Sequence, residues 1–195
     1  MGRAARFISL LLLGLFLASA CARDTKRVYF IPLGKVPSLS LDQLAKDYQA
    51  KLQLKIELLK EVPLDSRTVD FWRRQVVAEE LIQLMKRQYP REAKNPKAVL
   101  IGITAGDMFI REYPWRFAFA FRQEGRFVVV STARMDPVNL HEDPDPALLY
   151  TRARKMISKN LGLLYYGLPE SKDPRSVLYG PVLGVDDLDK IGENF

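Results

Sequence analysis

One segment of the chain, residues 98–103 (Ala-Val-Leu-Ile-Gly-Ile), has no polar side chain at any position. A strand with one face in solvent alternates apolar and polar residues, whereas a strand covered on both faces is apolar throughout. The segment therefore predicts a central strand between two covering layers. With a single cysteine the chain has to build its core without a disulfide, and its 48% of hydrophobic residues is enough for one domain.

Strand and helix patterns alternate along the rest of the sequence. Strands are predicted at residues 28–31 and 54–58, and a hairpin at 117–121 and 127–131 around Glu124-Gly125. Helices are predicted at 40–52, 69–88, 146–161 (with Gly162 as its stop) and 186–191. The first of these helices begins with a capping box of Ser40 and Gln43. This order predicts a single α/β domain over residues 28–195, with a mixed twisted sheet of about four or five strands. The helices at 40–52 and 69–88 are expected to pack on that sheet.

The N-terminus has the layout of a secretory signal peptide over residues 1–20. Arg3 and Arg6 precede an apolar run at residues 7–17, which is too short to cross a bilayer of roughly 30 Å as a helix. Small residues (Ala18-Ser19-Ala20) then precede Cys21, which resembles a bacterial lipobox and predicts a lipidated Cys21 with a short tether over residues 21–27. The alternative is a general signal peptidase site, which would release a secreted protein with a spare thiol.

A lipidated Cys21 predicts an exported protein, anchored to a membrane of the bacterial cell envelope. Because Ala22 and not Asp follows the cysteine, the outer membrane is expected in a Gram-negative host. The formal charge of +7 falls by the two charges of Arg3 and Arg6 to +5 after cleavage. This charge favours an anionic surface, such as phospholipid headgroups or cell-wall polymer. It is too diffuse for a nucleic-acid partner, and export argues against one.

Five short segments occur in an order that is typical of one peptidase family. They are Ile31-Pro32-Leu33-Gly34, Asp70-x-x-Arg73-x-Gln75, residues 99–104 with Asp107-Met108-Phe109, Phe117-x-Phe119-x-Phe121, and residues 128–131 with Arg134. Together they resemble the archaemetzincins, a branch of the zinc-dependent metzincin peptidases, over residues 28–191. The resemblance implies a metzincin-like fold, in which an edge strand near residues 127–131 borders a cleft above the helix at 147–161.

The zinc motif of that family is absent. It reads H-E-x-x-H-x-x-G-x-x-H, in which three histidines bind zinc and the glutamate activates a zinc-bound water. At the corresponding residues 155–165 only Gly162 is retained. Lys155, Lys159 and Tyr165 stand at the ligand positions, and Met156 replaces the base. A protonated lysine has no lone pair for a metal, and the chain has one histidine. The resemblance therefore implies an inactive member without a metal or other cofactor.

The residues at these positions have two interpretations. In one, Lys155, Met156, Lys159 and Tyr165 line an anion- or peptide-binding cleft in the space of the former zinc site. In the other, Lys155 and Lys159 join Arg152 on a solvated basic face of the helix. The nearest match to the family's Met-turn residue is Leu178.

Other polar residues carry weaker signals. His141 lies in an acidic loop and is interpreted as a solvated side chain rather than as a ligand. Ser131, Ser158 and Asp107 could belong to a hydrolase, but no G-x-S-x-G nucleophile elbow is present. The alternating aromatic residues at 117–121 are interpreted as core packing.

Three functions are compatible with these features. The leading hypothesis is an inactive archaemetzincin-like envelope lipoprotein that binds an extended peptide or an envelope protein through its vestigial cleft and edge strand. The second is a hydrolase of envelope peptide or polymer with a non-zinc or relocated site, marked by perturbed acids or bases in a pocket. The third is a structural envelope component, marked by a broad exposed apolar patch.

Overall fold

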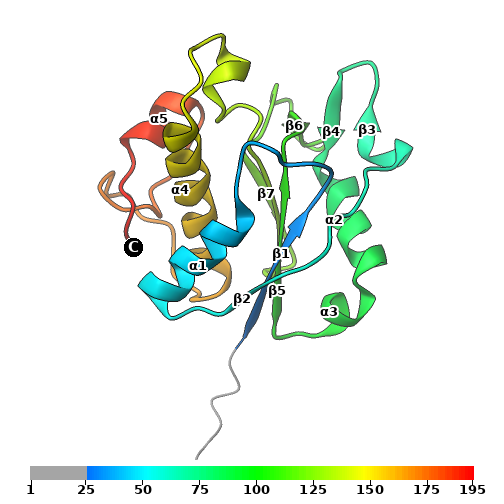
Figure 1. The fold of residues 1–195 in the computed structure, drawn as a ribbon, viewed down its shortest axis with the longest axis horizontal. Helices are drawn as coiled ribbons and strands as arrows, with labels where there is room; N and C mark the ends of the chain where they lie inside the picture. The colour runs from blue at the N-terminus through cyan, green and yellow to red at the C-terminus, as the bar shows by residue number, and fades with distance from the viewer. Residues whose placement is uncertain (1–25) are drawn as a thin grey trace, which may run out of the picture.

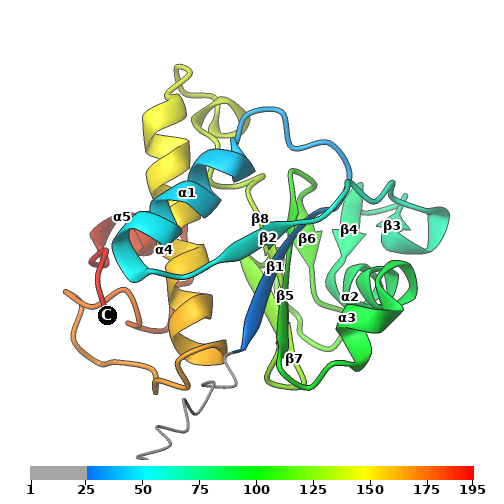
Figure 2. The same ribbon diagram turned by 60° about the horizontal axis from the view of Figure 1, so that its bottom comes forward.

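A five-stranded sheet lies between two layers of helices in the computed structural model, which describes residues 26–195. The signal peptide and lipidated Cys21 predicted from the sequence lie outside the described residues. Figures 1 and 2 show α1 (Leu41–Leu52), α4 (Pro146–Leu164) and α5 (Val185–Lys190) on one side of the sheet. The other side carries α2 (Ala78–Gln88) and α3 (Pro90–Lys94). The mixed α/β single domain predicted from the sequence is confirmed.

The main sheet has the strand order β2-β1-β5-β8-β7. Its strands are β1 (Arg27–Pro32), β2 (Ile56–Leu58), β5 (Ala98–Thr104), β7 (Ala120–Gln123) and β8 (Phe127–Ser131). All neighbours are parallel except β7, which is antiparallel to β8. All seven residues of β5 are buried, so the prediction of a central strand is confirmed. The amino ends of the parallel strands share one end of the domain, where the chain enters at Lys26 (Figure 1).

Alternate residues of the central strands belong to two separate apolar cores. Phe30 and Ile101 pack with α1 and α4 on one face of the sheet. Ile31 and Leu100 pack with α2 on the other face. The period of two along a strand thus supplies both layers from one run of apolar residues.

The predicted helix at residues 69–88 is wrong in its first half. Residues 66–77 form a single 3-10 turn (Ser66–Thr68) and a hairpin of β3 (Val69–Asp70) and β4 (Gln75–Val77), and α2 begins only at Ala78. The Oδ1 atom of Asp70 accepts hydrogen bonds from the backbone N–H groups of Trp72 and Arg73, both at 3.0 Å. Such a side-chain bond to nearby backbone favours a turn over a helix. A short strand, β6 (Met108–Phe109), pairs with β4 and completes a second sheet.

The prediction that residues 127–131 form an edge strand is also wrong. These residues are β8, which lies between β5 and β7 and is hydrogen-bonded on both sides. The edge strand on this side of the sheet is β7 instead, and β2 is the edge strand on the other side. The hairpin and its second strand were predicted correctly, whereas its first strand is Ala120–Gln123 and not residues 117–121. The order of the hairpin in the sheet depends on the long-range pairing of β8 with β5, which a local pattern does not contain.

The helix at residues 146–164, α4, continues through the glycine that was predicted to stop it. A methyl group on Gly162 would lie 2.6 Å from Cδ2 of Leu178, so the glycine serves close packing and not termination. A loop before α4 contains the other 3-10 turn, Pro137–Leu140. None of the helices within residues 26–195 has the length and apolar character needed to span a bilayer.

The first and last helices agree closely with the sequence. The Ser40 Oγ atom accepts a hydrogen bond from the Gln43 N–H at 3.3 Å and caps α1. The Gln43 side chain donates through its Nε2 atom to Asp47, one turn further along α1, at 2.9 Å. The terminal helix, α5, lies within one residue of its predicted ends.

The segment after α5 packs tightly against the backbone near Arg175, and a substitution there can test this packing. A methyl group on Gly192 would lie 1.7 Å from the carbonyl oxygen of Arg175, so the backbone would have to move. We expect Gly192→Ala to lower the free energy of unfolding by about 2 kcal/mol in urea denaturation. Gly184→Ala is the control, since its methyl group would meet no atom within 4 Å. Equal stability of the two variants would contradict the packing.

Candidate functional site

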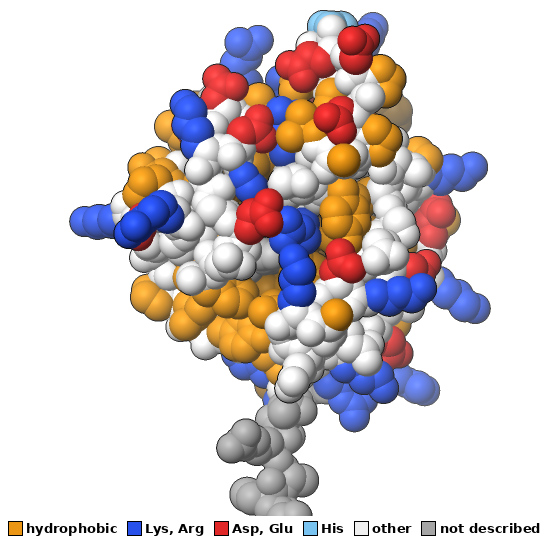
Figure 3. Space-filling model, turned by 60° about the vertical axis from the view of Figure 1, so that its left-hand side comes forward, with side chains coloured by type: hydrophobic (Ala, Val, Ile, Leu, Met, Phe, Trp, Pro, Cys, Tyr) orange, Lys and Arg blue, Asp and Glu red, His pale blue; other side chains and the backbone are white. Residues whose placement is uncertain are grey.

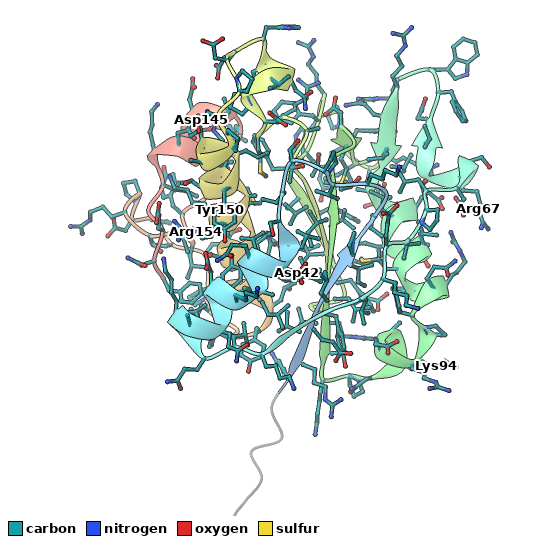
Figure 4. All side chains as sticks on the ribbon, in the orientation of Figure 1. Asp42, Arg67, Lys94, Asp145, Tyr150 and Arg154 are labelled. Atoms are coloured by element: carbon teal, nitrogen blue, oxygen red, sulfur yellow. The ribbon has the colours of Figure 1, made fainter. Side chains whose placement is uncertain are left out.

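The helix that carries Lys155, Met156 and Lys159, α4, is held firmly at its start and along its side. The Asp145 Oδ1 atom accepts from the Leu148 N–H at 2.9 Å, and Pro146 occupies the first turn. Figure 4 shows Asp145 at the start of α4, with Tyr150 and Arg154 further along the helix. The Tyr150 hydroxyl donates to Asp47 of α1 at 2.6 Å. Burial and this carboxylate raise the pKa of Tyr150, while the hydroxyl lowers the pKa of Asp47.

The side chain of Lys155 is buried beneath the C-terminal segment, residues 165–195. Only 7% of the residue is exposed. Its Nζ donates to the backbone carbonyls of Leu188 at 3.1 Å and Asp189 at 2.7 Å. Removal from water lowers the pKa of Lys155, against the opposing attraction of Asp189.

Lys159, one turn further along α4, is buried in the same way. It is 5% exposed, and its Nζ donates to the carbonyl of Tyr179 at 2.6 Å. A carboxylate oxygen of Glu170 lies 3.7 Å from the same nitrogen. Burial lowers the pKa of Lys159, with Glu170 opposing the shift.

A third cation on this side of α4, Arg152, completes the attachment of the C-terminal segment. Its guanidinium forms two parallel bonds to the Asp189 carboxylate, at 2.8 and 2.7 Å, and donates to the carbonyl of Met135 at 3.0 Å. The bonds to Asp189 raise the pKa of Arg152. Arg152, Lys155 and Lys159 are therefore buried and bonded to protein atoms, so the interpretation of a solvated basic face is wrong.

The other positions of the vestigial motif point elsewhere. Because α4 is unbroken at Gly162, Tyr165 lies about 240° around the helix axis from Lys159, at 100° per residue. Its ring lines a pocket near Lys26 on another side of the domain. Met156 is 4% exposed and packs in the core between α4 and the sheet. The four positions thus do not converge on one cleft.

Comparisons with known proteins identify the fold. No family model matches the sequence, and no curated protein matches it. Solved structures that match include a zinc-dependent peptidase from Methanocorpusculum labreanum, with a TM-score of 0.71, 18% identity, and coverage of 86% of this chain and 95% of that one. The structural neighbours of this chain are archaemetzincin-like zinc-dependent peptidases.

Two of these neighbours are archaemetzincins by name. The protein from Methanopyrus kandleri has a TM-score of 0.68 and 25% identity, with coverage of 88% of this chain and 89% of that one. The protein from Archaeoglobus fulgidus, in complex with malonate, has a TM-score of 0.67 and 19% identity, with coverage of 87% and 94%. The resemblance to archaemetzincins is therefore confirmed at the level of the fold.

The side chains at the positions predicted to correspond to the zinc ligands do not fit a zinc ion. The ammonium groups of Lys155 and Lys159 have no lone pair, and their protons are already donated to carbonyls. Throughout residues 26–195, no three or more His, Cys, Asp and Glu side chains are placed together to hold a metal. His141 is exposed in the loop before α4, with a positive φ of 64°.

An ion pair joins the edge strand β7 to the C-terminal segment, and sequence reasoning missed it. Arg122 of β7 donates to a Glu170 carboxylate oxygen at 3.2 Å and to the Asn160 side chain at 3.4 Å. Since Glu170 also lies beside Lys159, the edge strand, the helix and the C-terminal segment meet at this point. The pair joins residues 48 positions apart, and no local pattern in the sequence indicates it.

The residues that suggested archaemetzincins meet in a second network, at the carboxyl ends of the strands. Asp107 receives two bonds from Arg134, at 2.9 and 2.8 Å, and one from the Gln75 side chain at 2.9 Å. Arg73 in turn donates to Gln75 at 2.8 Å. The sequence placed Arg73 and Gln75 on a helix, whereas their actual position is the β3–β4 hairpin. The network joins the two sheets.

The hydroxyl groups considered for a hydrolase have structural partners. Ser131 donates to the carbonyl of Gly106 at 2.7 Å. Ser158 shares a hydrogen bond with the Tyr48 hydroxyl at 3.0 Å. Within the described residues, neither hydroxyl is hydrogen-bonded to a histidine or a carboxylate, so the structure assembles no triad from them.

Charge pairing under the C-terminal segment has a measurable consequence. We expect Asp189→Ala to lower the free energy of unfolding by about 2 kcal/mol, because the buried Arg152 guanidinium loses its charged partner. Asp173→Ala is the matched control and should cost less than about 1 kcal/mol, since its pair with Arg175 is exposed. Urea denaturation measures both, and a cost as large for the control would contradict this role of Asp189.

The lowered pKa of Lys159 gives stability a pH dependence of known sign. The unfolded chain keeps the lysine proton up to a pKa of about 10.4, whereas the folded protein releases it at lower pH. Between these values the unfolded state binds more protons, so stability rises with pH. We expect the unfolding free energy of the wild type, minus that of Lys159→Met, to increase as pH approaches about 10.4. A constant difference across a series of urea titrations would contradict the shift.

Proposed function

We propose that this chain is a catalytically inactive relative of the archaemetzincins that binds an extended peptide or an envelope protein. One observation carries the proposal. At two of the three metal-ligand positions stand buried lysines, Lys155 and Lys159, whose ammonium groups bond to backbone carbonyls. A dication would have to displace these bonds and share the space with two positive charges.

The open edge of β7 supports a binding role. The carbonyl of Phe119 accepts a hydrogen bond from the N–H of Ser131 in β8 at 2.9 Å, and Gln123 is paired with Phe127. In an antiparallel pair the alternate residues, Ala120 and Arg122, direct their N–H and C=O groups away from the partner strand. A peptide in extended conformation can add to such an edge through main-chain bonds, without a metal. The Arg122–Glu170 pair at this edge offers charges of both signs to its side chains.

The position of the N-terminus supports a membrane-anchored form. We propose that cleavage before Cys21 leaves a lipid on that cysteine and places the protein in the bacterial cell envelope. The domain begins at Lys26, five residues after Cys21, so the lipid would hold the end that contains the amino ends of the strands.

The inactive site predicts weak metal binding. After incubation with excess zinc and gel filtration, we expect the purified protein to retain far less than one zinc per chain by elemental analysis. An archaemetzincin treated in the same way is the control. Stoichiometric zinc, or cleavage of peptides that a chelator abolishes, would contradict the proposal.

Two variants at one residue test the edge strand. Peptides selected from a phage-displayed library of short linear sequences should bind the wild type and Arg122→Ala. Arg122→Pro removes the outward N–H while the strand keeps its bonds to β8, and should weaken binding by about tenfold, the value of one backbone bond. Fluorescence polarisation measures the affinities. Peptides that bind Arg122→Pro equally well would show that β7 is not the site.

A further inference from the structure

The end of the domain at which the chain enters the sheet carries an excess of exposed basic side chains. These residues, here called the entry end, are Lys26, Arg27, Lys51, Lys55 and Lys94. Figure 4 shows Lys94 at the same end of the domain as the grey trace. Within the described residues, Arg27, Lys51, Lys55 and Lys94 take part in no ion pair. Of the acidic residues nearby, Glu124 is paired with Lys86. Glu57, and Glu92 of α3, are the acidic residues at this end without an ion pair within the described residues, so basic side chains remain in excess.

A pocket opens in the middle of the entry end. Its volume is about 380 Å³, and Lys26, Arg27, Lys55 and Glu57 are among the residues that line it. This volume is in the range of sites for small ligands. The Nζ of Lys26 donates to the carbonyls of Leu164 and Tyr165, at 2.9 and 3.0 Å, so the end of α4 holds this wall in place.

Aromatic rings extend the entry end on one side. Tyr165 lines the pocket and packs edge-on against Tyr166, with 4.8 Å between ring centroids. Tyr166 in turn packs against Phe195 at 5.4 Å, and both are more than 40% exposed. Figure 3 shows apolar side chains gathered low on the domain and basic ones beside the grey trace. Rings with one apolar and one polar end favour the boundary between lipid and water.

We infer that the entry end docks on an anionic bilayer and that its pocket receives the phosphate of a lipid headgroup. The inference rests on the proposed lipid at Cys21 for its geometry. The five residues from Cys21 to Lys26 span at most about 18 Å, so this end of the domain is the one that meets the membrane. Each lysine or arginine at an anionic surface strengthens partitioning by about fivefold.

The opposite end of the domain provides internal reporters. Both tryptophans of the chain, Trp72 and Trp115, lie in loops next to β3, β4 and β6, away from the grey trace in Figure 1. Trp72 is 99% exposed and Trp115 is 51% exposed. If the entry end docks, both rings stay in water. If the β3–β4 turn inserted instead, both would approach lipid.

The experiment uses the mature lipidated protein in vesicles of phosphatidylcholine, with or without phosphatidylglycerol. Phosphatidylglycerol should reduce acetylation of Lys51, Lys55 and Lys94 several-fold, as measured by mass spectrometry. Acetylation of Lys35 and Lys60, beyond the carboxyl ends of β1 and β2, should not change. High salt should restore labelling. Tryptophan fluorescence should not be quenched by brominated lipid.

Matched charge reversals separate the two ends. Lys55→Glu/Lys94→Glu should abolish the phosphatidylglycerol-dependent protection of Lys51, whereas Lys35→Glu/Lys60→Glu, with the same change in net charge, should retain it. Equal labelling at both ends, protection on phosphatidylcholine alone, or quenched tryptophans would overturn the docking face.

The lipid anchor is tested separately, by the mass of the N-terminal peptide. If Cys21 carries no lipid, the same protein is floated with the same vesicles. Docking then still predicts flotation that depends on phosphatidylglycerol. The entry-end double variant loses two lysines and gains two repelled glutamates, so it should weaken this flotation by more than about 25-fold. Flotation that is absent, or equal in both double variants, would reject docking whatever the state of Cys21.

Discussion

Burial of β5 on both faces is the constraint on which the other elements depend. A strand without polar side chains needs a layer of helices on each side, and the chain meets this need with α4 and α1 on one face and α2 on the other. The side of α4 that carries Arg152, Lys155 and Lys159 is buried as well. The C-terminal segment covers this side, and α4 holds it through buried cations.

The face of α4 at which the sequence predicted a vestigial zinc site instead holds the C-terminal segment through buried cations. In a metzincin motif, histidines of one helix and the chain beyond it converge on zinc. Here Lys155 and Lys159 reach the carbonyls of that following chain directly, and Arg152 adds a charged pair with Asp189. Hydrogen bonds to ammonium groups thus hold together elements that a dication could otherwise connect, at the cost of lowering the lysine pKa values.

Local signals predicted the elements whose residues interact with near neighbours. Ser40, Pro146 and the Glu124-Gly125 turn act within a few residues, and each begins or ends an element where expected. The errors occurred where distant residues decide. Residues 69–77 have an apolar pattern that suits a helix, but Asp70 turns the chain and β6 pairs with β4. At position 162 a glycine is needed because Leu178 occupies the space that a side chain would fill, and the helix continues through it.

The sequence by itself determined that α/β layers form around residues 98–103, and that lysines stand at positions 155 and 159, because residue type and period are local properties. Only the tertiary structure decided which atoms the ammonium groups of Lys155 and Lys159 bond to. Their partners, the carbonyls of Tyr179, Leu188 and Asp189, are backbone atoms that every residue possesses, so no residue type reveals them in advance. The open edge at β7 was decided in the same way, by which strand pairs with β5 across the sheet.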